Sequence, residues 1–332
     1  MNRKVCVTTY VWGKKYQEYI PIAAYSIKKM YPDYDVIFFL HGAIDPSLKK
    51  ILLNLNLLDK IIIVENKYSD CPKMNAHKAM ALRWVLWDDR FMNYDYLYII
   101  DIDMFYIKEP VPLHEQHIFH MENVTHLSFD NMARVVTRQG YGLKQYLFDI
   151  AVYVKNFGVK YLFNFLLSLR KEIRMVSGLH FIDVKKYYSL FTPDKIENYK
   201  KKIYDGSYIR NMNTVNNEAF LYLMLKEIGF DVDHLPKQDF SDPYSHTNFN
   251  NFNQYLFRPT HGIHLGNYRD STSESKIKTI LNLDSEKYYK NYIKSFLLND
   301  PDFKNFLTVV DDDIKDYFKR YFHYANINQS LI

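Results

Sequence analysis

The chain has 332 residues, of which 48% are hydrophobic and 24% are charged, a balance typical of a soluble globular protein. Its formal net charge of +5 is modest and does not indicate a nucleic-acid-binding protein. Two cysteines, Cys6 and Cys71, argue against a disulfide scaffold and fit a reducing compartment. We find neither the pattern of a signal peptide nor the ~18 apolar residues of a membrane span. The composition therefore predicts a cytoplasmic protein.

The first hundred residues alternate between strand and helix patterns. The strand patterns lie at 4–11, 35–42, 59–66 and 94–101, and the helix patterns at 17–30, 46–57 and 75–89. Such alternation with short loops predicts an α/β fold, Rossmann-like, with a mainly parallel central sheet flanked by helices. Ligands of such sheets bind outside the carboxyl ends of the strands.

The later sequence is more helical. Residues 142–173 read as one or two amphipathic helices interrupted near Gly158, and residues 216–230 read as a helix that ends at Gly229. From residue 273 onward the chain is polar and helical. We expect a catalytic domain at 1–272, with 142–173 as a helical insertion, and a C-terminal helical tail at 273–332. The polar face of the insertion either forms a lid on the acceptor side or serves packing alone.

Two carboxylates follow the fourth strand. The segment YLYIIDIDMFYI (96–107) places Asp101 and Asp103 after an uncharged run, and of five Asp-x-Asp triplets only this one follows an uninterrupted hydrophobic strand pattern. A carboxylate in apolar surroundings is costly unless it is paired or bound to a cation. Oxygen ligands suit a hard divalent cation, and Mn²⁺ also accepts an imidazole. The pair therefore predicts a site for Mn²⁺ or Mg²⁺.

A further ligand must come from elsewhere in the chain. The loop HGIHLG carries His261 and His264 between glycines, which allow close approach of the backbone to a ligand. In an extended strand these two histidines face opposite sides. Because Ile263 and Leu265 flank His264 and are expected on the buried face, we favour His264, with His261 as the alternative. Structural histidines that bind no metal are the other interpretation.

These segments together resemble a known family. With NAHKAMALRWVLW before the carboxylates, and SGLHFID, NNEAFL and IHLG after them, the chain resembles GT-A fold glycosyltransferases with a DXD motif. It is most similar to the retaining family 8 group of glycogenin and lipopolysaccharide galactosyltransferases, over residues 3–270. The resemblance rests on the order and spacing of motifs. It implies a nucleotide-sugar donor, usually UDP-linked, whose diphosphate is bridged by Mn²⁺.

The resemblance also implies roles for individual residues. Asp103 would chelate the metal, Asp101 would contact the metal and the ribose, and the histidine before Gly266 would be the third protein ligand. The residues assigned to the donor are Thr8, Thr9 and Tyr10 beside the nucleoside, and Asn75 and Lys78 on the helix whose lysine reaches the donor.

Three departures from the family pattern bear on the reaction. Val176 stands where the family usually has Asn. The Asp-Gln pair that lies beside the anomeric carbon in the family is replaced by Asn217 and Glu218. The family's Lys-Pro-Trp is replaced by NYRD, so that Arg269 is left for the phosphate contact. The resemblance implies retention of anomeric configuration. An inverting enzyme needs a carboxylate base, for which Glu218 and Asp130 are the candidates.

Other classes fit less well. A haloacid-dehalogenase-type phosphatase requires a small residue where Phe105 stands, and a nucleotidyltransferase requires a Gly-rich phosphate loop after the first strand. A non-catalytic carbohydrate-binding or scaffold protein is the remaining alternative.

The resemblance thus implies a metal-dependent glycosyltransferase acting on a glycan or lipid-linked acceptor. We expect it to build bacterial surface polysaccharide, capsule or lipooligosaccharide, with no nucleic acid as partner. The tail mixes Lys and Arg with Tyr and Phe, as in SEKYYKNYIKSFLL and IKDYFKRYFHY. This pattern predicts docking at the inner face of the plasma membrane or self-association into a homo-oligomer. Packing of the tail against the catalytic domain is the alternative.

Overall fold

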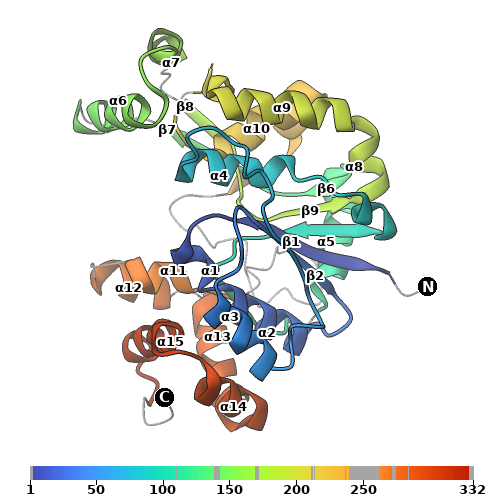
Figure 1. Ribbon diagram of the computed structural model, residues 1–332, viewed down its shortest axis with the longest axis vertical. Coiled ribbons are helices and arrows are strands. Elements are labelled where there is room, and N and C mark those ends of the chain that lie inside the picture. The colour runs from blue at the N-terminus through green and yellow to red at the C-terminus, as the bar shows by residue number, and fades with distance from the viewer. Residues whose placement is uncertain are drawn as a thin grey trace. The chain divides into compact units, whose positions relative to one another are not determined.

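The structure is a computed structural model that describes residues 3–109, 111–137, 143–168, 172–210, 212, 214–235, 237–238, 262–270, 274–282 and 284–328. Figure 1 shows its helices and strands with their labels. Its contacts divide the chain into two compact units. The first unit comprises Met1–Tyr10, Tyr68–Ile100 and His120–Pro243, and the second comprises Val11–Lys67, Asp101–Phe119 and Tyr244–Ile332. Neither unit is continuous in sequence. The predicted boundary at residue 272 stays a prediction.

The first unit contains strands that run mostly in one direction. Their order is β1 (Val5–Val11), β4 (Tyr96–Ile99), β9 (His180–Asp183) and β6 (Phe129–Asp130). β1 pairs in parallel with β4, and β9 runs antiparallel to both β4 and β6. β1, β4 and β6 therefore share one direction. The predicted α/β class with a mainly parallel central sheet and flanking helices is confirmed.

Burial on both faces explains the composition of these strands. Every residue of β1 is buried, and so are the last three residues of β4. Strands covered on both faces read as continuous apolar runs without alternation, as VCVTTYV does. Cys6 and Cys71 are both buried, and neither is in a disulfide bond.

A smaller sheet also belongs to the first unit. β7 (Ala133–Thr137) pairs in parallel with β10 (Lys237–Gln238) and antiparallel with β8 (Glu172–Val176). The α-helices of this unit are α4 (Ala76–Leu82), α6 (Leu143–Phe157), α7 (Leu162–Ser168), α8 (Val184–Leu190), α9 (Pro193–Asp205) and α10 (Asn217–Ile228). Its shorter helical turns are Arg83–Val85, Asp89–Asn93, Met121–Thr125, Ser207–Ile209 and Val232–His234.

Helix α10 begins and ends as the sequence predicts. The Asn216 side chain caps its first turn by accepting from the N–H of Glu218 at 2.6 Å. Gly229 ends the helix with a φ of +112°, a left-handed conformation that favours glycine.

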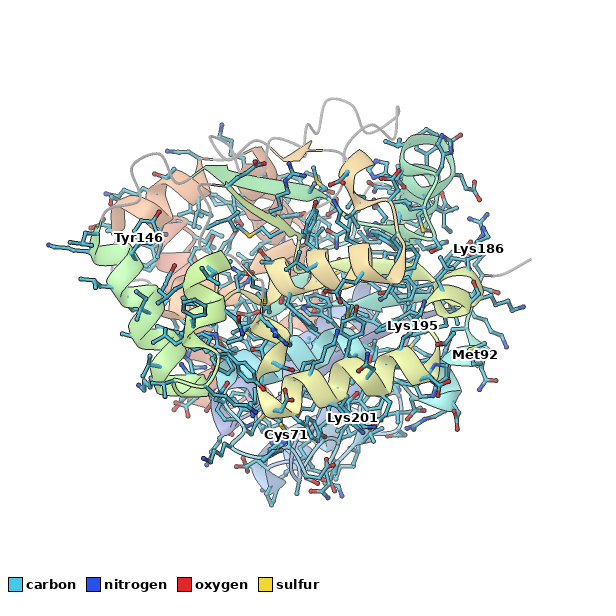
Figure 2. All side chains as sticks on the ribbon, turned by 90° about the horizontal axis from the view of Figure 1, so that it is seen from above. Cys71, Met92, Tyr146, Lys186, Lys195 and Lys201 are labelled. Carbon is cyan, nitrogen blue, oxygen red and sulfur yellow. The ribbon has the colours of Figure 1, made fainter. Side chains whose placement is uncertain are left out.

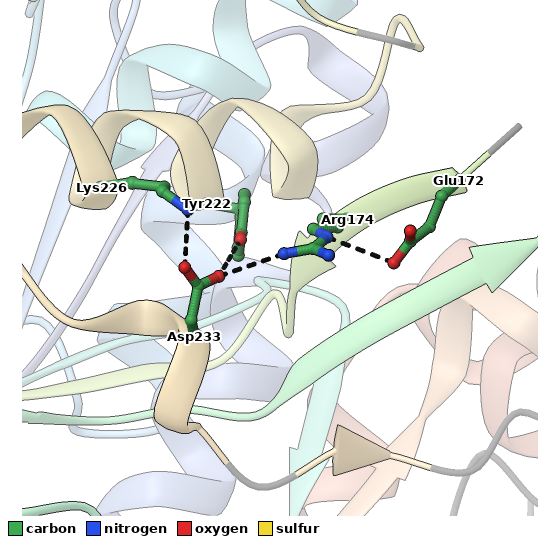
Figure 3. A network of polar contacts seen from close by, with 5 residues as sticks. All are labelled: Glu172, Arg174, Tyr222, Lys226 and Asp233. Atoms are coloured by element: carbon green, nitrogen blue, oxygen red, sulfur yellow. Dashed lines mark hydrogen bonds and ion pairs between the residues drawn. The ribbon is translucent and has the colours of Figure 1, made fainter. Parts of the chain in front are cut away.

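A network of polar contacts joins α10 to β8 (Figure 3). The Asp233 carboxylate accepts from the Tyr222 hydroxyl and from the Lys226 ammonium, both at 2.6 Å, and lies 3.3 Å from Nη1 of Arg174. Arg174 also pairs with Glu172 at 3.2 Å. The Lys226 hydrogen bond, followed by that of Tyr222, lowers the pKa of Asp233 to about 2.

The second unit has two pairs of strands. β2 (Asp35–Leu40) pairs in parallel with β3 (Ile62–Val64), and β5 (Met104–Tyr106) pairs antiparallel with β11 (Gly262–His264). The helices of the N-terminal half and the middle are α1 (Lys14–Gln17), α2 (Ile20–Met30), α3 (Pro46–Asn54) and α5 (Leu113–His120). Asp45 caps α3 by accepting from the N–H of Ser47, and Pro46 occupies its first turn, where a missing N–H costs nothing.

The C-terminal helices of the second unit pack on α2 and β5. They are α11 (Leu265–Asp270), α12 (Glu274–Leu281), α13 (Asp284–Ser295), the turn Leu297–Asn299, α14 (Pro301–Val309) and α15 (Asp312–Tyr324). Tyr25 of α2 stacks on Phe306 at 4.2 Å between ring centroids, and Phe105 of β5 meets Phe318 edge-on at 5.0 Å. These aromatic residues of the tail are buried within the unit.

Among the described residues, no helix combines the length and apolar character needed to cross a membrane. The predicted docking of the tail at a membrane and the predicted homo-oligomer stay predictions.

Candidate functional site

The second unit brings Asp103 and His264 together. Asp103 directly precedes β5, and His264 is the last residue of β11, opposite Met104. The N–H of Leu265 donates to the carbonyl of Asp103 at 2.8 Å, which fixes the two strand ends against each other. Nε2 of His264 lies 3.7 Å from Oδ1 of Asp103. Pairing of β5 with β11 therefore places a carboxylate and an imidazole side by side, although they are 161 positions apart in the sequence.

The strand alternation of β11 directs the imidazole. Ile263 and Leu265 are fully buried, whereas the side chain of His264 is 35% exposed and that of Asp103 is 15% exposed. Successive side chains of a strand point to opposite faces, so burial of the two neighbours turns His264 toward the accessible side. The role of His264 as a metal ligand stays a prediction.

Gly266 leaves the space that these two side chains occupy. A Cβ at this position would lie well inside 3.0 Å of Oδ2 of Asp103 and 3.2 Å from Cε1 of His264. The backbone of Gly262 approaches β5 equally closely, because a Cβ there would collide with the carbonyl of Phe105. Glycine is therefore required at position 262, where the clash is with backbone, and at position 266 it allows the observed placement of the Asp103 side chain.

The chemistry of this pair fits a divalent cation. A separation of 3.7 Å is too long for a hydrogen bond, yet one ion can contact both atoms. Nδ1 of His264 is buried and has no hydrogen-bond partner within the described part of the chain. No group of three His, Cys, Asp or Glu side chains suited to a metal is found among the described residues, and the predicted contact of Asp101 with the metal stays a prediction. The fit rests on Asp103 and His264.

The sequence-predicted nucleoside residues lie on β1 in the first unit. Thr8 and Thr9 are buried, and the carbonyl of Thr8 accepts from the N–H of Ile100 at 3.0 Å. The ring of Tyr10 lies 5.4 Å from that of Tyr68, and burial raises the pKa of Tyr10 well above its ordinary value. Their role toward a nucleoside stays a prediction.

Asn75 and Lys78 have structural partners in the first unit. The Asn75 side chain caps α4 by accepting from the N–H of Lys78 at 3.0 Å, and its amide donates to the carbonyl of Asn156 at 3.2 Å. The Lys78 ammonium donates to the carbonyls of Pro72 and Tyr204, at 2.8 and 2.7 Å. Burial lowers the pKa of Lys78. To reach a donor, Lys78 must give up these two hydrogen bonds.

Asp130 lies next to a buried polar network that sequence reasoning missed. Its side chain is almost fully buried and lies 3.4 Å from Nδ1 of His120. The neighbouring Asn131 accepts from the N–H of Ser177 at 2.8 Å, donates to the Ser177 carbonyl at 3.2 Å and lies 3.0 Å from Nδ1 of His180. Two features of the sequence could have indicated this network: Asn131 directly follows the candidate base Asp130, and the segment SGLH contains both Ser177 and His180.

The other two reaction candidates lie at the start of α10. Asn217 and Glu218 are half-buried in its first turn, where the helix dipole favours a carboxylate. Both belong to the first unit, as Asp130 does. Compared with Asp130, Glu218 is the more accessible carboxylate.

Arg269 is held within the second unit. Its Nη2 pairs with Oε2 of Glu18 at 3.1 Å, and its Nη1 donates to the carbonyl of Lys15 at 3.2 Å. The guanidinium also lies over the rings of Tyr19 and Tyr317. This environment anchors α11, whose first residue, Leu265, bonds to the backbone of Asp103. The alternative ligand His261 lies outside the described residues.

Comparison of the sequence with known proteins finds no relative. No family model matches the chain, and no curated protein matches it.

Comparison of the fold finds distant solved structures. One is the mannosyltransferase Ktr4p from S. cerevisiae, with 10% identity, a TM-score of 0.39, and coverage of 68% of this chain and 66% of that one. A second is the glycosyltransferase GlyE in Streptococcus pneumoniae TIGR4, with 12% identity, a TM-score of 0.36, and coverage of 72% and 46%. The galactosyltransferase LgtC has 13% identity, a TM-score of 0.30, and coverage of 60% and 66%. The chain thus matches less than two thirds of the length of each. At such low similarity, function must be inferred from the residues of this chain.

Proposed function

We propose that this chain is a GT-A glycosyltransferase that uses Mn²⁺, or Mg²⁺, and a nucleotide-sugar donor. The observation that carries the proposal is the juxtaposition of Asp103 and His264, with Gly266 leaving room for both. A carboxylate and an imidazole at the carboxyl end of strands suit a mid-row divalent metal. The resemblance of the sequence to family 8 gives the donor class, with UDP as the expected nucleotide.

The two protein ligands would leave most of the coordination sphere to other groups. Mg²⁺ sites in phosphate-transferring enzymes commonly use one or two carboxylates together with waters and substrate phosphates. When bound, the cation would supply Lewis-acid stabilisation of the negative charge that develops on the departing nucleoside diphosphate. The contribution of the chain is to hold Asp103 and His264 at a fixed separation through the β5–β11 pairing. Asp101 remains our candidate for an additional contact to the metal and the ribose.

Other residues of the chain would serve the sugar and the acceptor. Glu218 is our first candidate to act as base if the reaction inverts the anomeric centre, because it is more accessible than Asp130. If the reaction retains configuration, as the family resemblance implies, Asn217 and Glu218 would lie beside the anomeric carbon. We further propose a glycan or lipid-linked acceptor in bacterial surface polysaccharide synthesis at the inner face of the plasma membrane.

The test is a titration of Mn²⁺ into the full chain, followed by hydrolysis assays with UDP-, GDP- and CMP-sugars. We expect Asp103→Ala and His264→Ala to weaken Mn²⁺ binding by more than the roughly 10- to 100-fold that loss of an outer-sphere partner costs. Asp101→Ala should abolish turnover but keep weak metal binding.

His261→Ala is the matched control, and we expect it to have only a mild effect. Turnover close to wild type in Asp103→Ala with Mn²⁺ would contradict the proposed metal site. A severe loss in His261→Ala with little effect in His264→Ala would reassign the histidine ligand.

A further inference from the structure

The outward face of helices α6 and α7 is apolar. Of the sixteen large hydrophobic side chains exposed among the described residues, eight lie between residues 143 and 167. We call them the apolar face: Leu143, Leu147, Phe148, Val154, Val159, Phe163, Leu166 and Leu167. The insertion was expected to present a polar face, so this concentration differs from the expectation. Soluble monomers rarely expose so many apolar groups together without a function.

Helices α6 and α7 form a helical hairpin, which packs on the rest of the first unit through its other face. Tyr153 of α6 and Phe165 of α7 are fully buried and stack on each other, with ring centroids 4.7 Å apart. Phe157 meets Tyr208 edge-on at 5.7 Å, and the carbonyl of Asn156 accepts from the Asn75 amide. These contacts attach the hairpin to the rest of the first unit. The apolar face is therefore available for something other than the core.

The charges around the apolar face are positive. Lys144, Lys155 and Lys160 are exposed, whereas Asp149, the single acidic residue of the segment 143–168, is buried. The ammonium of Lys160 lies 4.9 Å above the ring of Tyr161. Figure 2 shows Tyr146 on α6 at the margin of the view, among side chains that point outward. Apolar groups flanked by lysine and tyrosine are typical of helices that lie in a membrane interface.

We propose that the apolar face of α6 and α7 inserts into the interfacial layer of a membrane that contains anionic lipids. The three lysines complement a negatively charged surface. A second copy of this chain would instead bring six like charges together around the same contact, which disfavours self-association through this face. The inference rests on the proposed function only in one respect: a lipid-linked acceptor gives the membrane contact a purpose.

Vesicle flotation of the full chain, without donor or metal, tests this inference separately from catalysis. We expect binding to phosphatidylcholine vesicles that contain phosphatidylglycerol and at least about tenfold weaker binding to phosphatidylcholine alone. Phe148→Ser combined with Phe163→Ser should reduce binding to the anionic vesicles at least about tenfold. Lys144→Gln, Lys155→Gln and Lys160→Gln together should remove the preference for anionic lipid.

Leu53→Ser is the control. Leu53 is 58% exposed, close to the 61% of Phe148, but it lies on α3, outside both the apolar face and the C-terminal tail. We expect this variant to bind as wild type does, with circular dichroism confirming that every variant is folded. Three results would overturn the inference. These are absence of binding to both vesicles, loss of binding only in Leu53→Ser, and a concentration-dependent dimer that the double variant abolishes.

Discussion

Gly266→Ala tests whether the Asp103–His264 pair is a metal site. A Cβ at position 266 would lie far closer to Oδ2 of Asp103 than the 3.4–4 Å of ordinary contact, and 3.2 Å from Cε1 of His264. The carboxylate and, to a smaller extent, the imidazole must therefore move. The substitution displaces both ligands without removing either of them, so it tests their geometry and not merely their presence.

The effect on metal binding should greatly exceed the effect on stability. Gly266 lies in α11, where Ala is favoured over Gly by about 1 kcal/mol, and this gain partly offsets the ~1–3 kcal/mol that overpacking costs. A displacement on the order of 1 Å at a reactive centre costs about 100-fold in activity. We expect Mn²⁺ affinity and donor turnover to fall by about this factor, which corresponds to about 3 kcal/mol. The melting temperature should change by only a few degrees, about 2–4 °C per kcal/mol for a chain of this size.

The assay is calorimetric titration of Mn²⁺, together with donor hydrolysis and thermal melting. Gly42→Ala is the control because it is the same substitution at a position where a Cβ would meet nothing within 4 Å. It should leave all three measurements unchanged. A folded Gly266→Ala protein with wild-type Mn²⁺ affinity would refute the assignment of Asp103 and His264 as ligands.

Two further predictions concern stability and pH. Glu286 is 4% exposed and accepts from the Tyr268 hydroxyl at 3.2 Å, and burial raises its pKa to about 8. Because the folded state holds the proton, the free energy of unfolding should fall as pH rises from about 4.5 to about 8. In urea unfolding, Glu286→Gln should remove this slope and add up to about 3 kcal/mol at pH 7, and an unchanged slope would contradict the reasoning. Asp233 has a lowered pKa, so its stabilisation is present above about pH 4 and is lost as pH falls toward 2. Because its side chain is 45% exposed, Asp233→Asn should cost less than about 1 kcal/mol at pH 7, and thermal melting should show that cost shrinking at high salt.

The early elements could be predicted because their periodicity is local. The pattern at 35–42 matches β2 at Asp35–Leu40, and the pattern at 46–57 matches α3 at Pro46–Asn54. The helix expected at 75–89 instead gives way at residue 83 to a tighter helical turn. Apolar spacing and capping residues act within a few positions, so they can be read directly from the sequence.

The short strands could not be predicted, because their partners are remote. β5 and β11 have three residues each and pair across more than 150 positions of sequence. A strand of this length carries too few residues for alternation to be recognised. Asp103 was nevertheless identified as a candidate, because it follows the long apolar run that becomes β4.

Charged residues were the least predictable part of the candidate site. Lys78 and Arg269 were both expected to contact donor phosphates, as cations near an anionic leaving group do. In the structure, Lys78 donates to two backbone carbonyls, and Arg269 pairs with Glu18, a residue about 250 positions away. A sequence shows that a cation is present but not which acceptors the fold places around it. The same holds for the uncharged Asn131, whose three buried contacts are with Ser177 and His180, residues 46 and 49 positions away.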